Sequence, residues 1–158
     1  MRPRQCTLNS RLREFQFKML HGIVFTNHHL FRFKISPNNL CCYCKKEEET
    51  YRHLFFECEH AHLIWSNCNN TFDFVDIGNL NWVQIFGGIE LEDKGKERLA
   101  NHFLILVKFL IFKGREKGLF INMDEINQKF KEEEWEEKKI ASERGKLSLH
   151  LKNWENIN

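Results

Sequence analysis

The sequence has little of what marks several protein classes. Its 158 residues include two Pro and eight Gly, too few for a turn-rich β-sandwich or for Pro-rich linkers. The longest apolar run, residues 103–112, is interrupted by Lys108 and is too short to span a membrane. No apolar stretch follows the charged first residues, so we expect no secretory signal, no membrane partner and an intracellular location, nuclear or cytoplasmic. In such a compartment, the six Cys are expected to be thiols or metal ligands rather than disulfides.

The formal net charge of +2 is weak evidence for a polyanionic partner, but the charges are unevenly distributed. Residues 1–34 carry a net charge of +6 and residues 94–117 a net charge of +5, which leaves −9 for the rest. Such asymmetry can build basic faces on a nearly neutral protein. The same side chains also suit ordinary solvated helix surfaces, where Lys and Arg are common.

Cysteine and histidine gather between residues 41 and 58 with the spacing C-x2-C-x8-H-x4-C, formed by Cys41, Cys44, His53 and Cys58. A C-x2-C pair on a tight turn points two sulfurs at one place, and a second pair from a helical turn completes a tetrahedron. Zinc accepts three thiolates and one imidazole in this geometry. Four protein ligands close the site, so we expect the zinc to be structural rather than catalytic.

Spacing alone leaves other ligand sets open. Cys42 could replace Cys41, although a C-x-C pair fits tetrahedral coordination less well than a C-x2-C pair. His60 or His62 could compete for the last two positions. The plain alternative to a metal site is a set of buried thiols beside a core histidine.

The last two ligands pose a geometric difficulty. Thr50 is a good N-cap, which would place His53 in the first turn of a helix. Cys58 follows His53 by five residues, about 140° around an ideal α-helix. Both side chains can face one ion only if Cys58 lies at a tightened or bent helix end.

Apolar residues recur at helical spacing along most of the chain. Helices are expected over residues 10–23 with Ser10 as N-cap, over 28–34 after a Thr-Asn break, near 63–69, near 82–86, and over 96–113 with Gly114 and Gly118 at its end. A further helix is expected over 123–139, and residues 140–154 either continue it or form a second segment after Gly145. The sequence therefore predicts a mainly α fold, in which a small zinc-stapled CCHC segment packs within a helical domain that has a charged C-terminal helical extension. We expect three parts: a helical lead-in with the zinc-binding domain (1–72), a continuation with a buried apolar helix (73–122), and a charged helical tail (123–158).

The run from Leu40 to Cys58, LCCYCKKEEETYRHLFFEC, followed by Trp65, resembles the reverse-transcriptase zinc-binding domain. That domain lies C-terminal to the polymerase in non-LTR (LINE-type) retrotransposon proteins. Its four ligand positions match the Cys and His residues above, and its Glu-Thr and His-Leu-Phe motifs are also present. Residues 15–34, 101–117 and 137–154 are similar to the family's lead-in, long apolar helix and charged tail.

The resemblance implies a zinc-binding part of a retrotransposon protein that handles nucleic acid. The polymerase motif Tyr/Phe-Ala-Asp-Asp and an endonuclease-like set of carboxylates are absent from the sequence, so we expect no catalysis and no small-molecule substrate. The chain is expected to be a fragment of such an element or a stand-alone derivative that begins at Met1.

Two functions compete at this stage. The first is binding of RNA or single-stranded DNA through basic faces. The candidate phosphate contacts are Arg11, Arg13, Lys18, Arg32, Lys34, Lys45 and Lys46. Aromatic side chains in the same segments could stack on bases, but core packing is the expected role of Phe15, Phe17, Phe31 and Phe33.

The second function is that of an interaction domain, which docks on a reverse-transcriptase core or on another copy of itself. The apolar helix 103–112 and the acidic helix 132–139 suit this role. An enzyme that pairs Cys44 or Cys58 with His53 as a base is disfavoured, because the same residues serve better as ligands and no third orienting group is evident.

Overall fold

The structure is a computed structural model that describes residues 6–69 and 71–154. Its helices are α2 (Ser10–Leu20), α3 (Asn27–Arg32), η1 (His53–Glu57), α4 (Glu59–Asn67), η2 (Ile77–Asn79), α5 (Trp82–Gly87), α6 (Lys94–Lys117), α7 (Met123–Glu143) and α8 (Leu147–Trp154). The described residues contain no strand, only an isolated antiparallel bridge between Leu40 and Glu48. The mainly α fold expected from the sequence is confirmed. Within this described part, no helix has the length and apolar character needed to cross a membrane.

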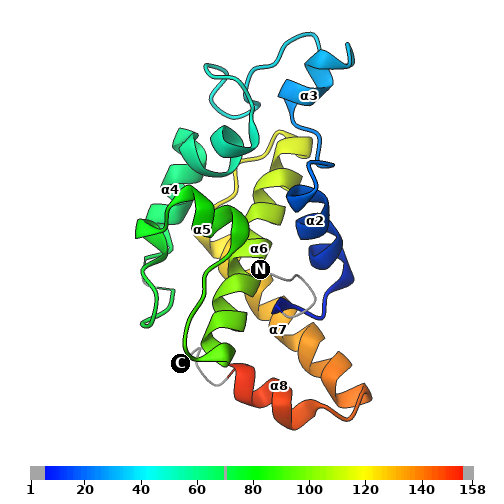
Figure 1. The fold of residues 1–158 in the computed structure, drawn as a ribbon, viewed down its shortest axis with the longest axis vertical. Helices are drawn as coiled ribbons and strands as arrows, with labels where there is room; N and C mark the ends of the chain where they lie inside the picture. Colours follow the sequence, from blue (N-terminus) through cyan, green and yellow to red (C-terminus); the bar gives the residue numbers. More distant parts are fainter. Residues whose placement is uncertain (1–5, 70, 155–158) are drawn as a thin grey trace.

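Helix α6 runs through the middle of the molecule and organises the others (Figure 1). Helices α2, α7 and α8 pack directly against it, and η1 contacts it beside α4. All ten residues from Leu99 to Lys108 are buried, so α6 is enclosed on every side there. The helix extends beyond the expected 96–113, because Asp93 caps its start and Gly118, with φ +66°, ends it. Because the end turns of α6 are polar, the spacing of apolar residues does not show where the helix begins and ends.

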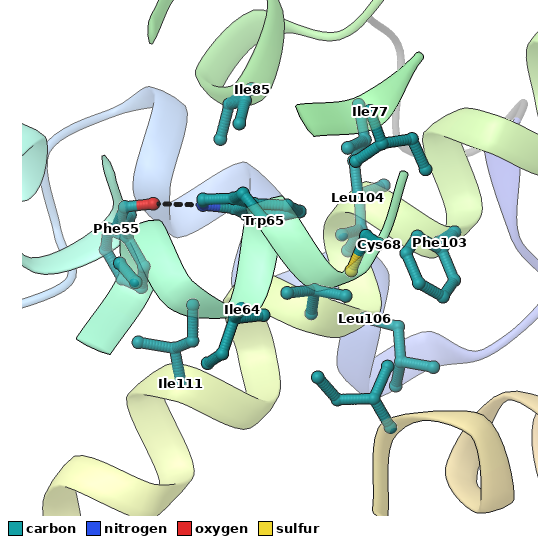
Figure 2. Packing of buried hydrophobic residues seen from close by; sticks show 14 of the residues in the cluster. Phe55, Ile64, Trp65, Cys68, Ile77, Ile85, Phe103, Leu104, Leu106 and Ile111 are labelled. Atoms are coloured by element: carbon teal, nitrogen blue, oxygen red, sulfur yellow. Dashed lines mark hydrogen bonds between the residues drawn. The ribbon is translucent and has the colours of Figure 1, made fainter. Parts of the chain in front are cut away.

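The core lies where α4, α5 and α6 meet, and Trp65 is central to it (Figure 2). The indole Nε1 of Trp65 donates a hydrogen bond of 2.8 Å to the carbonyl oxygen of Phe55. Phe55 lies between His53 and Cys58 in the chain, so this bond ties the core to the segment that carries the Cys/His cluster.

Helix α2 differs from its expected limits. Asn9, not Ser10, is the N-cap, because its side chain accepts from the amides of Arg11 and Leu12. The helix ends at Leu20, three residues early, where Gly22 adopts φ +68°. The Thr-Asn break before α3 is confirmed: the Thr26 and His29 side chains form a capping box there.

The charged helix α7 is held to the body of the protein through buried polar contacts. The Glu137 carboxylate, 1% exposed, accepts hydrogen bonds from the Thr7 hydroxyl (2.5 Å) and the Leu8 amide. Arg98 of α6 approaches the same carboxylate at 3.5 Å. Residues of all three expected parts thus join one continuous core, and the division at residues 72 and 122 stays a prediction.

Lys108 of α6 is fully buried beneath α2 and α5. Its Nζ donates to Gln16 Oε1 (2.9 Å) and to the carbonyl oxygen of Phe86 (3.1 Å), and no carboxylate is paired with it among the described residues. Burial lowers the pKa of Lys108 to about 7, because the low-dielectric interior disfavours the ammonium form.

This buried lysine predicts a specific pH dependence of stability. Between pH 7 and about 10.5 the unfolded state binds the Lys108 proton and the folded state does not, so stability rises with pH across this window. We expect the free energy of unfolding of the parent to rise relative to Lys108→Met, by up to about 1.4 kcal/mol per pH unit. Urea unfolding of the zinc-loaded proteins at several pH values measures the difference.

Lys113→Met, on an exposed position of the same helix, is the matched control. Its difference from the parent should stay flat over the same pH range. Parallel pH profiles of the parent and Lys108→Met would contradict the depressed pKa.

Candidate metal centre

A tight turn places the first two sulfurs. The segment between Leu40 and Glu48 folds back on itself, with the Cys41 amide donating to the Glu47 carbonyl at 2.8 Å. The Lys45 amide donates a hydrogen bond to the Cys41 carbonyl at 3.0 Å, and Lys45 itself has φ +57°. This turn brings the ligand atoms of Cys41 and Cys44 close together, as the C-x2-C spacing predicts.

A widened helical turn places the other two ligand atoms. Thr50 Oγ1 accepts from the His53 amide at 3.1 Å, which confirms Thr50 as the cap. Residues His53–Glu57 then form a π-helix, closed by the Cys58 amide on the His53 carbonyl at 2.8 Å. In an ideal α-helix the His53 and Cys58 side chains would point about 140° apart around the axis, and this i to i+5 turn removes most of that angle. The two side chains converge through a wider turn, not a tightened one, and Cys58 leaves it with φ −59° and ψ 137° to start α4.

The resulting cluster has the dimensions of a tetrahedral zinc site. The ligand atoms of Cys41, Cys44, His53 and Cys58 all lie within 4.8 Å of one another. The sulfurs of Cys41 and Cys58 are 3.8 Å apart, and Cys44 Sγ lies 3.3 Å from His53 Nε2. Zinc–sulfur bonds of about 2.3 Å space tetrahedral sulfurs about 3.8 Å apart. The chemistry and the spacing of the donors therefore fit zinc.

Thiols packed this closely need a cation if they are to ionise together. The pKa of Cys41 is raised to about 12, first by the Cys42 thiol and then by burial, against a lowering by Cys58. The Cys41 thiol and burial also raise the pKa of Cys58. Burial opposes ionisation of Cys44 too, but the backbone of Glu47 and Lys46 and the His53 ring lower its pKa overall. A divalent cation favours the thiolate at all three positions.

The competing ligand sets are not favoured by the structure. Cys41, Cys42 and Glu49 do form a second group of close ligand atoms. However, both oxygens of Glu49 already accept hydrogen bonds from protein donors. His60 packs its ring on Tyr43, with ring centroids 4.3 Å apart, and neither it nor the exposed His62 joins a cluster among the described residues.

Glu49 joins the metal-binding turn to the rest of the fold. Its fully buried carboxylate accepts from the Asn27 amide and the Cys42 amide, each at 2.7 Å. Arg115, near the C-terminal end of α6, donates its Nε to the same carboxylate at 2.6 Å and its Nη2 to Asn27 Oδ1 at 2.8 Å. One ion pair thus fixes the start of α3, the turn and α6 together.

A second contact supports the same attachment. The Tyr43 hydroxyl donates to the Ile111 carbonyl of α6 at 2.6 Å. Gly114 makes room for it, because a Cβ at this position would lie 2.8 Å from that hydroxyl and 2.7 Å from the Leu119 carbonyl. Neither Arg115 nor Tyr43 was identified from the sequence. The sequence shows a basic residue near the end of a mostly apolar helix and a glutamate within the metal motif, but nothing in it pairs the two.

With this geometry in place, comparison with known proteins decides the family. Residues 5–65 match a family model described as zinc-binding in reverse transcriptase. This segment belongs to the reverse-transcriptase zinc-binding family. The chain is also 30% identical, over 107 of its residues, to the uncharacterized 149 kDa protein of transposon TX1 from Xenopus laevis. That alignment covers 67% of this chain and 8% of the transposon protein, and no solved structure matches the chain.

The structure divides the seven candidate phosphate contacts into two kinds. Lys18 pairs with Glu14 at 2.6 Å, and Lys46 pairs with Glu59 at 2.9 Å. The other five have no ion-pair partner in the described part of the chain: Arg11, Arg13, Arg32, Lys34 and Lys45. All but the half-buried Arg13 are exposed.

The second basic segment, residues 94–117, does not form a comparable face. Most of its charges are engaged within the fold: Lys94 with Glu97, Arg98 with Glu137, Lys113 with Glu116, Arg115 with Glu49, and Lys108 in the core. For this segment, the reading as ordinary structural and helix-surface charge holds.

The expectation of core packing holds for one of four phenylalanines and is wrong for the others. Phe15 is 6% exposed, and its ring meets Phe55, Phe109 and Phe112. The exposed fractions of Phe17, Phe31 and Phe33 are 51%, 47% and 55%. Apolar spacing on a short helix cannot tell a ring that faces the core from one that faces solvent.

The role of Glu49 can be tested by removing its charge. Glu49→Gln keeps the shape but leaves the Arg115 guanidinium, whose side chain is 10% exposed, without a counter-ion. We expect a loss of about 3–5 kcal/mol in the free energy of unfolding of the zinc-loaded protein. Glu48→Gln, at the neighbouring exposed position, should change it by about 0.5 kcal/mol or less. Equal losses in both variants, measured by urea unfolding, would show that the Glu49 ion pair does not hold the turn.

Proposed function

We propose that the domain binds one structural zinc through Cys41, Cys44, His53 and Cys58, and that it is a non-catalytic module that binds RNA or single-stranded DNA. The convergence of the four ligand atoms supports the zinc site. Four protein ligands leave no open position for a reacting water, as expected for a structural zinc. When bound, the zinc crosslinks the turn at residues 41–44 to the π-turn that opens α4.

The nucleic-acid role rests on one observation, the exposed cationic side chains without counter-ions. Helix α3 and the metal-binding turn lie at one end of the molecule (Figure 1). Arg32 ends α3, Lys34 follows the helix by two residues, and Lys45 is on the turn. A side chain already paired to a carboxylate gains little from a phosphate, whereas an unpaired one releases the counter-ions of the nucleic acid. The family match to a zinc-binding segment of reverse transcriptase and the transposon relative agree with this partner.

The ligand set is tested by a pair of adjacent substitutions. Cys44→Ser should lower the zinc content well below one per chain and unfold residues 40–65, because metal-binding free energy is folding free energy in such a segment. Cys42→Ser is the matched control and should keep the zinc, because Cys42 lies outside the group of four ligand atoms and Ser retains the backbone amide that binds Glu49. Metal analysis of the purified proteins and thermal melting with and without a chelator measure both effects. Loss of zinc from the Cys42 variant alone would contradict the assignment.

Nucleic-acid binding is tested with charge-matched double variants. Fluorescence anisotropy with single-stranded RNA at low salt should show micromolar or tighter binding by the zinc-loaded protein. Arg32→Gln with Lys34→Gln should weaken binding about tenfold and reduce the salt slope by about 1.4, for two lost phosphate contacts.

Arg144→Gln with Lys146→Gln removes the same charge from the exposed turn between α7 and α8, at the opposite end from α3 (Figure 1). This control should bind like the parent. Absence of binding by the parent, or equal losses in the two double variants, would refute the proposed surface.

A second function, docking on a reverse-transcriptase core or on another copy of the chain, is favoured by a groove of about 520 Å³ between α2 and α6. Its apolar lining includes Ile23, Phe25, Phe109 and Phe112. Association that depends on protein concentration in sedimentation, together with no affinity for RNA, would favour this function over the first.

A further inference from the structure

The surface around α3 combines positive charge with exposed rings. Residues 15–46 contain five Lys or Arg and neither Asp nor Glu. Within this segment, Phe33 stands at the C-terminal cap of α3 with 55% of its surface exposed, between Arg32 and Lys34. Both cationic neighbours are exposed, and neither is in an ion pair among the described residues.

One ring contact among the described residues braces the Phe33 ring. Phe25 meets it edge to face, with ring centroids 5.4 Å apart and an interplanar angle of 80°. Phe25 in turn lies 6.0 Å from the His29 ring, and His29 lies 5.3 Å from Tyr51, close to the metal ligands in sequence. This chain of rings links the zinc-stapled segment to an aromatic surface that faces solvent.

We propose that Phe33 is a stacking platform for an unpaired base, with Arg32 and Lys34 binding the phosphates on either side of it. This inference rests on the proposed nucleic-acid function and narrows its ligand to strands with unstacked bases. A ring held in place loses little conformational freedom when a base stacks on it. A base inside a duplex has both faces covered and offers none to the ring.

The charge pattern favours a nucleic acid over a protein at this surface. The core of a protein interface is depleted in charged residues, since unpaired charges are costly to desolvate. Here the two residues that adjoin the ring in sequence are both cationic and lack counter-ions in the described structure. A strand of alternating planar bases and phosphates matches a ring flanked by two cations.

The test separates contacts with bases from contacts with the backbone. Zinc-loaded full chain is titrated with a single-stranded RNA of about 12 nucleotides and with an abasic strand of equal length and charge. The parent should prefer the base-bearing strand by at least about fivefold. Phe33→Leu should abolish this preference and leave the abasic affinity unchanged, while Phe33→Trp should retain the preference. Phe17→Leu, at a similarly exposed ring on α2, is the matched control and should behave like the parent.

A second readout reports stacking directly. A 2-aminopurine placed in the strand should lose fluorescence on binding to the parent and to Phe33→Trp, but much less on binding to Phe33→Leu. Zinc content and circular dichroism establish that the variants are folded.

Each of the remaining outcomes would overturn either the stacking platform or the proposed function. Equal affinity of the parent for the two strands, or an unchanged preference in Phe33→Leu, would overturn the stacking platform while leaving backbone binding intact. Loss of self-association in Phe33→Leu with unchanged RNA binding would assign the ring to a protein interface and also overturn it. No binding of either strand by the parent would refute the proposed function itself.

Discussion

The structure depends on the convergence of three sulfurs and one imidazole nitrogen from two short backbone turns. The segment of about twenty residues that carries them has no strand among the described residues, so crosslinks rather than a sheet hold its two turns together. The 3.8 Å between Cys41 and Cys58 sulfurs and the 3.3 Å between Cys44 and His53 match the edges of a small tetrahedron. The π-turn is what allows this, because an α-helix would turn Cys58 away from His53.

The crosslinked segment acts on the rest of the protein through Glu49. Its carboxylate accepts hydrogen bonds from the start of α3, from the metal-binding turn and from Arg115 on α6, so an ordered turn also orients α3. The exposed ring and the cationic side chains of α3 are thereby positioned by a site that they do not touch. We expect zinc to control the proposed nucleic-acid surface by this route, through the geometry of the turn rather than through contact with the ligand.

Features that depend on residues close together in the chain could be predicted from the sequence. The spacing of the Cys and His residues located the cluster, and apolar periodicity located α6, because both signals lie within a few residues or turns. The partnership of Glu49 with Arg115 spans 66 positions and leaves no local pattern. The exposure of Phe33 and the burial of Lys108 also escaped prediction, since each contradicts the usual place of its residue type and is decided by packing across the fold.

Zinc-edge X-ray absorption of the purified, zinc-loaded chain measures the number and kind of atoms bound to the metal. We expect one zinc with three sulfur neighbours at about 2.3 Å and one nitrogen at about 2.0 Å. A shell of oxygen and nitrogen atoms only, or one with fewer than three sulfurs, would contradict it.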